Sequence, residues 1–329
     1  EDGSYTLALG CTDMGTGCDT IMAQIAADCL NTPMDNIVVF SVDTDISPYD
    51  SGSYASATTY TTGVAVMKAC DELKKKICKL GAEMMEVDER KVDFDGSCVF
   101  YDETIDISDG ADKNAAGHMT DAEEGYRVDM DAISSENAQK KVSLKDIALK
   151  STFFNNIELQ VVKQHSSPIS PPPFMVGMAE VEVDTETGSV DVLDYVAVVD
   201  CGTPINPNLA RVQTEGGIAQ GIGMALWEDV QYTDKGKIRN NSFMQYKITT
   251  RQDIGNIRVD FECSYEKSGP FGAKSIGELV IDTPCPALAE AIYNATGVRL
   301  TELPMTPEKI AMEILKNRES TRSGTKVEE

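Results

Sequence analysis

The sequence predicts an α+β fold in which two subdomains, residues 1–166 and 167–329, each mix strands with helices. Strand-like and helix-like patterns follow one another irregularly, without the regular strand–helix–strand succession of a doubly wound parallel sheet. At 329 residues, the chain is long enough to bury one large core or two modest ones. A run rich in serine and proline, from Ser167 to Pro173, is the strongest internal break and sets the boundary.

The first subdomain is expected to open with a turn at Asp2–Ser4 that leads directly into a strand, with no leader segment. Apolar residues recur at helical spacing from Ile21, and an Asp95-Gly96 pair favours a hairpin turn. Residues 103–141 are polar, acidic and weakly patterned, which is typical of a long surface excursion. The expected elements are a strand over Tyr5–Leu9, a helix burying Ile21, Ile25, Ala26 and Cys29, a strand over Ile37–Val42, a helix over about Ala57–Leu80, a hairpin over Val87–Tyr101 and a helix near Ser143–Lys150.

The second subdomain is expected to begin with a hairpin around Thr187-Gly188, because alternating apolar residues flank that pair on both sides. The charged tail after Lys316 is expected to be frayed. The expected elements are hairpin strands over Met178–Asp184 and Ser189–Val199, a glycine-rich helix over about Asn208–Glu228, a strand near Ile257–Cys263 and a helix over Ala287–Thr296.

The charge balance excludes two classes of partner. Acidic residues outnumber basic ones by 54 − 29 = 25, so the net charge is −25. A protein without a basic stripe is not expected to bind nucleic acid or an anionic membrane surface. No apolar run approaches the roughly 18 residues that span a bilayer, and no signal-peptide pattern opens the chain. We therefore expect a soluble, cytoplasmic protein.

The nine cysteines are too scattered for a metal or cluster site. They form no CxxC pair, and the two histidines, His118 and His165, lie far apart in the sequence. Reduced, mostly buried thiols are expected instead of disulfides, zinc or an iron–sulfur cluster. If the protein carries out redox chemistry, its electron carriers must lie elsewhere.

The loop from Gly10 to Gly17 lies between an expected strand and an expected helix. Free backbone N–H groups at a helix start attract anions, so a phosphate could bind there. The loop does not fit the GxxxxGK[ST] pattern, and Asp13 would repel a closely held phosphate, so an ATP site is not expected. An ordinary glycine-rich turn is the alternative.

The segment from Ser51 to Tyr60 contains seven hydroxyl side chains within ten residues. Helix capping accounts for one or two of them, and binding of polar ligand atoms is the functional explanation for the rest. Tyr54 is therefore either a ligand-facing residue or a core aromatic.

Four glycines, Gly216, Gly217, Gly221 and Gly223, fall inside the helix expected over Asn208–Glu228. Each costs roughly 1 kcal/mol relative to alanine in a helix. Close helix packing and close approach of a cofactor both explain why they are present. The Gly-Ile-Gly lies inside a helical pattern and lacks the third glycine of a dinucleotide motif. Gln213 and Gln220 are neutral amides suited to the edges of a pterin or a cytosine.

Glu278 follows a loop containing Gly269, Gly272 and Gly277. Glycines let a backbone approach a bulky ligand closely, so an acid placed there is a candidate presented group. A solvated loop glutamate is the alternative. In the same loop, Lys274 is either a contact for an anionic cofactor or a surface lysine.

The segment from Ser268 to Ile310 resembles the C-terminal end of the molybdenum hydroxylases, the xanthine dehydrogenase and aldehyde oxidase family, in residue types and order. The resemblance extends over nearly the full length and implies the second, C-terminal molybdopterin-binding domain of that family. It implies that Glu278 is the catalytic base. The chain departs from the family at Thr16, where glutamine is common, and at Leu279, where proline or serine usually follows the glutamate. The residues implied to bind the cofactor are Asp13, Met14, Gly15, Thr16, Gly17, Tyr54, Ala55, Ser56, Ala57, Thr58, Thr59, Gln213, Gln220, Lys274, Ser275 and Gly277.

Within that family, the chain most resembles the medium molybdopterin subunit of nicotinate dehydrogenases, in which the molybdenum polypeptide is split. The resemblance implies hydroxylation of nicotinate to 6-hydroxynicotinate, with water as the oxygen source. It implies molybdopterin cytosine dinucleotide with a terminal sulfido or selenido ligand, and molybdenum held by the pterin dithiolene with no protein ligand. Implied partners are a large molybdopterin subunit, a 2Fe-2S subunit and an FAD subunit. The alternatives are a purine, xanthine or aldehyde substrate, and a non-catalytic assembly subunit of the same fold.

Overall fold

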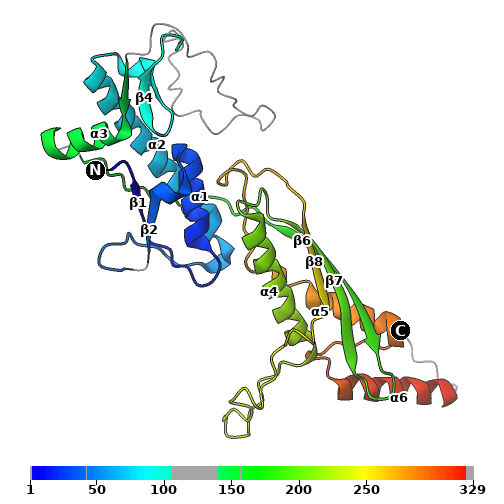
Figure 1. The fold of residues 1–329 in the computed structure, drawn as a ribbon. Coiled ribbons are helices and arrows are strands. Elements are labelled where there is room, and N and C mark those ends of the chain that lie inside the picture. Colours follow the sequence, from blue (N-terminus) through cyan, green and yellow to red (C-terminus); the bar gives the residue numbers. More distant parts are fainter. Residues whose placement is uncertain (1, 42, 106–139, 156–157, 324–329) are drawn as a thin grey trace. The chain divides into compact units, whose positions relative to one another are not determined.

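The computed structural model describes residues 2–41, 43–105, 140–155 and 158–323 (Figure 1). The chain divides into two compact units. Unit 1 comprises Glu1–Ser170 and Tyr265–Ala273, and unit 2 comprises Pro171–Ser264 and Lys274–Glu329. The first change of unit falls inside the serine- and proline-rich run, at Ser170. The sequence analysis assigned residues 265–273 to the second half, whereas the structure packs them with unit 1.

Unit 1 begins with a strand–helix–strand element. Strand β1 (Tyr5–Leu9) and strand β2 (Ile37–Ser41) are parallel, and helix α1 (Cys18–Leu30) joins them. Parallel strands need such a crossover because a tight turn only reverses the chain. The helix buries Met22, Ile25 and Cys29.

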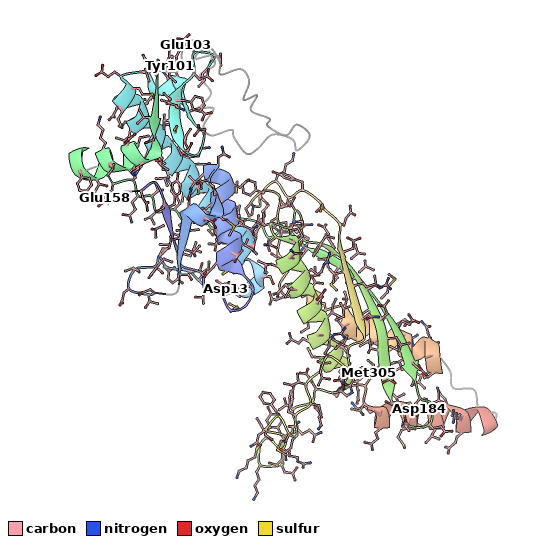
Figure 2. All side chains as sticks on the ribbon, in the orientation of Figure 1. Asp13, Tyr101, Glu103, Glu158, Asp184 and Met305 are labelled. Carbon is pink, nitrogen blue, oxygen red and sulfur yellow. The ribbon has the colours of Figure 1, made fainter. Side chains whose placement is uncertain are left out.

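The rest of unit 1 forms a second small sheet beside a long helix. Helix α2 (Thr58–Met85) precedes the antiparallel strands β3 (Val92–Phe94), β4 (Cys98–Tyr101) and β5 (Lys141–Ser143), and helix α3 (Leu144–Lys150) follows them. A π-helical turn, η6 (Ser151–Asn155), extends α3. The side chains of Tyr101, Glu103 and Glu158 are labelled around this part in Figure 2. One core joins α2, the sheet and α3, with Ile77, Phe94, Val99 and Ile147 buried in it.

Unit 2 packs helices on a mixed three-stranded sheet. Strands β6 (Phe174–Val183) and β7 (Val190–Asp200) are antiparallel, whereas β8 (Asn256–Phe261) runs parallel to β7. The helices are α4 (Pro207–Leu226), α5 (Pro284–Thr296) and α6 (Pro307–Ser323). Tyr195, Ile222, Leu288 and Ile310 are fully buried and come from β7 and these three helices, so a single core underlies the unit. Short 3-10 helices lie at Met34–Asn36, Tyr54–Ser56, Glu89–Lys91 and Leu279–Ile281.

The structure confirms the α+β class, and most of the predicted elements are present within a few residues. Helix α2 continues past Leu80 to Met85, and Gly81 within this extension allows close packing against Val99. The tail was expected to be frayed after Lys316, but α6 continues to Ser323, and residues 324–329 lie outside the described residues. Of the acidic stretch 103–141, residues 106–139 lie outside the described residues. Among the helices that the structure describes, none is long and apolar enough to cross a membrane.

Candidate functional site

The Gly10–Gly17 loop is organised around the carboxylate of Asp13. Its Oδ1 accepts hydrogen bonds from the backbone N–H groups of Gly15 at 2.9 Å and Gly17 at 3.1 Å. Burial raises the pKa of Asp13, but these hydrogen bonds outweigh it and hold the pKa below its ordinary value. Because the carboxylate already occupies amides that an anion would use, the loop is a poor phosphate site. Met14 remains 65% exposed, so the loop still offers an apolar surface to a neutral ligand.

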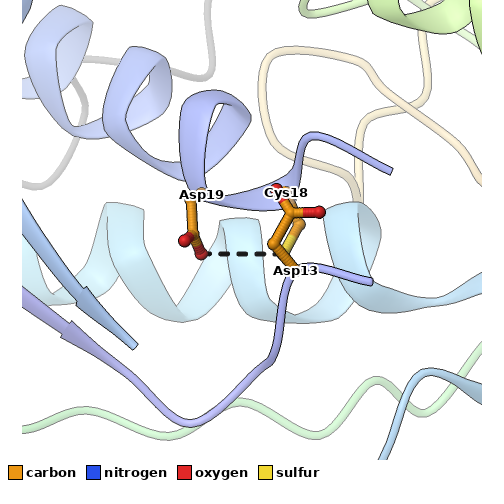
Figure 3. Close-up of side chains that lie close together, drawn as sticks. All are labelled: Asp13, Cys18 and Asp19. Carbon is orange, nitrogen blue, oxygen red and sulfur yellow. Dashed lines mark hydrogen bonds between the residues drawn. The ribbon is translucent and has the colours of Figure 1, made fainter. Parts of the chain in front are cut away.

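Asp13, Cys18 and Asp19 lie together at the start of α1, with possible ligand atoms within 4.8 Å of one another (Figure 3). Cys18 Sγ donates to Asp19 Oδ1 at 3.9 Å. A hydrogen bond with Cys11 and burial raise the pKa of Cys18 well above its ordinary value, so the thiol is neutral. Cysteine binds metals as the thiolate, so a metal at this cluster would have to displace the Cys18 proton.

The hydroxyl-rich segment of unit 1 is exposed at Ser51 and Tyr54 but buries Tyr60, whose hydroxyl donates to Ser268 Oγ at 2.7 Å. Tyr54 is 67% exposed, which rules out the core-aromatic alternative. Ala55 and Ser56 adopt left-handed φ values of 53° and 55°, which are uncommon for residues with a side chain. The N-cap of α2 is Ala57, which has no side-chain oxygen, so capping at that position does not explain the surrounding hydroxyl groups. Strained, exposed residues of this kind cluster at ligand sites.

A cavity of about 840 Å³ lies in unit 1 beside this loop. Its volume is within the range of small-molecule sites. It is lined by β1, the start of α2 and the extended segment 159–170. Four predicted cofactor residues, Tyr54, Ala55, Ala57 and Thr58, line it, whereas the Asp13–Gly17 loop does not. The Tyr5 hydroxyl at the cavity has no hydrogen-bond partner among the described residues, so a polar ligand atom would satisfy it.

The sequence analysis did not assign Lys163 and His165 to binding, yet both line the cavity. His165 Nδ1 lies 2.9 Å from Lys68 Nζ. Burial, and then the Lys68 charge, lower the pKa of His165, so the imidazole is neutral at pH 7. Their segment carries no periodic pattern, and only the fold shows that it runs beside β1 and α2.

The glycines of α4 divide into two kinds. A Cβ at Gly217 would clash with Val280, and a Cβ at Gly221 would lie 2.6 Å from Pro284 Cγ. A Cβ at Gly223 would clash with Glu228. Close packing therefore explains these three. At Gly216 no described atom lies within 4 Å of the built Cβ, so only Gly216 is open to a ligand.

Lys274 is a buried lysine and not a surface one. Its side chain is only 7% exposed, and Nζ lies 2.8 Å from Asp200 Oδ2 and 3.3 Å from the carbonyl oxygen of Pro172. The Lys274 backbone N–H also donates to the Cys201 carbonyl at 2.7 Å. The Asp200 carboxylate accepts from Ser264 Oγ at 2.7 Å. Lys274 therefore anchors its loop to the end of β7, which is a structural task that the sequence analysis did not foresee.

The Glu278 carboxylate is exposed at the end of this loop, and neighbouring residues on both sides of it are fixed by contacts with α4. On one side the Gly277 carbonyl accepts from Gln213 Nε2 at 3.5 Å. On the other, Val280 is buried at 1% exposure and packs on Gly217. Unit 2 thus brings together five predicted residues, whereas Gln220 lies exposed further along α4. The five are Gln213, Lys274, Ser275, Gly277 and Glu278.

Comparisons with known proteins identify the family to which the chain belongs. The family model of the molybdopterin cofactor-binding domain matches residues 1–255, so the chain belongs to that family. It is the C-terminal molybdenum-binding domain of the molybdenum hydroxylases.

The chain is 32% identical over 317 residues to Probable hypoxanthine oxidase XdhD of Escherichia coli (strain K12), covering 94% of this chain and 29% of that protein. It is 28% identical over 322 residues to the nicotine 6-hydroxylase large subunit of Paenarthrobacter nicotinovorans, covering 94% of this chain and 35% of that protein. The structure resembles quinoline 2-oxidoreductase from Pseudomonas putida 86, with a TM-score of 0.74, 25% identity and coverage of 94% of this chain and 36% of that one. The chain therefore spans about a third of the relatives that it matches.

Proposed function

We propose that this chain is the medium molybdopterin-binding subunit of a cytoplasmic, multi-subunit molybdenum hydroxylase. In this proposal, the enzyme hydroxylates a carbon of an N-heteroaromatic ring with oxygen from water, and Glu278 is the general base. The observation that carries the proposal is the presentation of Glu278. Its carboxylate is exposed, while Gln213 holds Gly277 on one side and Val280 is locked against α4 on the other.

The residues of unit 1 fit a planar, polar cofactor. The cavity offers exposed hydroxyl side chains, backbone groups and the unpartnered Tyr5 hydroxyl. Tyr54, Ala55, Ala57 and Thr58 line this cavity and would contact the pterin, with Ser56 and Thr59 on the same loop. The exposed Met14 side chain of the Asp13–Gly17 loop would contact a neutral part of the cofactor. An anionic part would not fit there, because the backbone N–H groups of Gly15 and Gly17 already donate to Asp13.

In unit 2, the amides of Gln213 and Gln220 are suited to a pterin or to the base of a cytosine dinucleotide form. Ser275 and Gly277 would contribute backbone contacts, and Lys274 would act through the loop that it anchors. When bound, the cofactor supplies the oxygen transfer and the two-electron redox chemistry, with a sulfido or selenido ligand on molybdenum. Glu278 would accept the proton released by the water that supplies the oxygen. General-base proton transfer of this kind contributes roughly 10²–10⁴ in rate in enzymes generally.

Nicotinate is the substrate we favour within the N-heteroaromatic class. The names of two relatives, nicotine 6-hydroxylase and quinoline 2-oxidoreductase, describe action on such rings. The name hypoxanthine oxidase describes action on a purine, which is also an N-heteroaromatic ring. Electrons would leave through a 2Fe-2S subunit and an FAD subunit, and a large molybdopterin subunit would complete the cofactor site.

The test is Glu278→Gln in the native complex. We expect molybdenum and pterin contents within error of wild type, and turnover of nicotinate lowered by at least about 10². Glu262→Gln, a change at another exposed glutamate of unit 2, is the matched control and should keep full activity. Loss of molybdenum from Glu278→Gln, or survival of its activity, would contradict the assignment. Turnover of hypoxanthine and of an aldehyde by the wild-type complex is measured in parallel, and the substrate with the highest turnover identifies the substrate class.

A further inference from the structure

Residues 228–253 of unit 2 form an ordered arm between α4 and β8, visible in Figure 1 as the yellow coil that leads away from the end of α4. Backbone and side-chain hydrogen bonds hold its shape. A bridge between Tyr232 and Ile238 closes a small hairpin, and Tyr246 Oη donates to Glu228 Oε2 at 2.9 Å. Thr249 Oγ1 donates to the Ala219 carbonyl at 3.1 Å, which attaches the arm to α4.

The arm has no core of its own. All 26 residues from Glu228 to Asp253 are described, and none is buried. Figure 2 shows their side chains spreading from the coil away from the helices and sheet of unit 2. Fixing a backbone costs roughly 1–2 kcal/mol per residue, which hydrogen bonds alone do not offset. A surface outside the arm must therefore bury apolar area of the arm to stabilise its ordered backbone.

The arm exposes apolar side chains that would supply such burial. Phe243 and Met244, at 84% and 87% exposure, lie in a turn that is closed by a hydrogen bond from the Tyr246 N–H to the Ser242 carbonyl at 2.8 Å. The turn therefore fixes the backbone that carries both exposed side chains. The exposed apolar side chains of the arm are Val230, Tyr232, Ile238, Phe243, Met244 and Ile248.

The charge of the arm is opposite to that of the chain. Five basic and four acidic residues give it a net charge of 5 − 4 = +1, so the remaining residues carry −25 − 1 = −26. Lys235, Lys237 and Arg239 gather on the hairpin and form no ion pair within the part of the chain that the structure describes. A surface that complements the arm has an apolar groove bordered by carboxylates.

We propose that the arm docks into another polypeptide of the same enzyme, in an apolar groove bordered by acidic side chains. This inference rests on the proposed function. Its occupant is the portion of the molybdenum protein that the longer relatives carry and this chain does not span. The fixed turn lowers the entropic cost of docking, and Phe243 and Met244 are the anchors. A second copy is the poorer partner, because docking would bring together two chains that each carry a net charge of −25.

A cross-link identifies what the arm contacts. A photo-reactive amino acid replaces Phe243 in the native complex, which is prepared from a mixture of isotopically heavy and light cells. We expect a cross-link to a different polypeptide that is homologous to the unspanned portion of the relatives, at a peptide rich in acidic and apolar residues. A heavy–light cross-link to a second copy, a cross-link to unit 1 of the same chain, or no cross-link overturns the proposal.

A variant pair measures the contribution of the arm. F243K/M244K should retain at least tenfold less of the co-purifying polypeptide per chain than wild type. M312K/L315K, which changes two apolar residues of α6 at 51% and 50% exposure, is the control and should match wild type. K237E/R239E should also weaken retention, and more strongly at low salt than at high salt. Equal retention by the arm and control variants contradicts the inference.

Two controls separate this inference from the proposed function. F243K/M244K should keep the wild-type melting temperature, because the two side chains contact no core. Molybdenum content is measured on the same samples. A docked arm without molybdenum would refute the proposed function alone, and molybdenum bound without a docked arm would refute this inference alone.

Discussion

The candidate residues of unit 1 and unit 2 are held in different ways. In unit 1, Asp13 organises an exposed loop through hydrogen bonds to neighbouring amides, and Tyr54 lies on a strained turn open to solvent. In unit 2, Lys274 is buried in an ion pair and Val280 is locked against Gly217. Unit 2 therefore fixes its candidate base through its core, whereas the loops of unit 1 depend on local contacts. Substitutions should accordingly cost more stability in unit 2.

The largest effect is expected for Lys274→Met. Removing one partner of a buried ion pair leaves an uncompensated charge and costs about 3–5 kcal/mol. The only tryptophan, Trp227, packs against the core of unit 2, so its fluorescence during urea unfolding reports on this unit. Lys235→Met, at an exposed lysine of unit 2, is the control and should change the free energy of unfolding by less than about 0.5 kcal/mol. Equal behaviour of the two variants would show that the ion pair does not hold the loop.

Gly217→Ala should have the next largest effect. The added Cβ clashes with Val280, and overpacking of this kind costs about 1–3 kcal/mol. The neighbouring Gly216→Ala is the matched control, because its Cβ meets no described atom and alanine favours the helix by up to about 1 kcal/mol. The Trp227 transition should move to lower urea for the first variant and to higher urea for the second. A shift in the same direction for both would remove the distinction between packed and open glycines.

The Asp200–Lys274 pair predicts a pH dependence. Burial raises the pKa of Asp200, but hydrogen bonds from Lys274 and Ser264 outweigh it, so the folded pKa lies below its ordinary value of 3.8. The stabilisation is therefore complete above the unfolded pKa and is lost as pH falls through the lower folded pKa. The difference in unfolding free energy between wild type and Asp200→Asn should be constant from pH 7 to 5 and should shrink below pH 4. A difference that grows on acidification would contradict this sign.

The smallest effect is expected for Asp13→Ala in unit 1. It removes the carboxylate that accepts hydrogen bonds from Gly15 and Gly17 on an exposed loop, at a cost of about 1 kcal/mol. Hydrogen exchange at these two amides should accelerate about fivefold, while the Trp227 transition of unit 2 should not move. Faster hydrogen exchange at the backbone amides of α1 in the same variant would show that the loop also stabilises the core of unit 1.

Sequence patterns predicted the elements that carry strong periodicity and clear turns. Strand β1 was predicted at the residues that the structure shows, and helix α5 ends at Thr296 as expected. The three-residue strand β5 has too short a pattern to detect. Helix α6 was not predicted, because its sequence is strongly charged, although Ile310 and Ile314 bury it in the core of unit 2.

The candidate site was only partly predictable for a physical reason. Glycine spacing marked α4 and the Glu278 loop, but spacing does not reveal whether a glycine meets a neighbour, as Gly217 does, or open space, as Gly216 does. The Asp200–Lys274 pair joins residues that are 74 positions apart, and no local pattern links them. Lys163 and His165 reach the cavity only through the path of an irregular segment.

The most direct test is metal and nucleotide analysis of the chain purified natively with its bound polypeptides. The account predicts molybdenum and pterin in equal amounts with the chain, CMP released on acid hydrolysis, and iron and FAD in the associated polypeptides. A native preparation that retains its associated polypeptides and contains neither molybdenum nor pterin would contradict the account, and Glu278 would then have no claim to be a catalytic base.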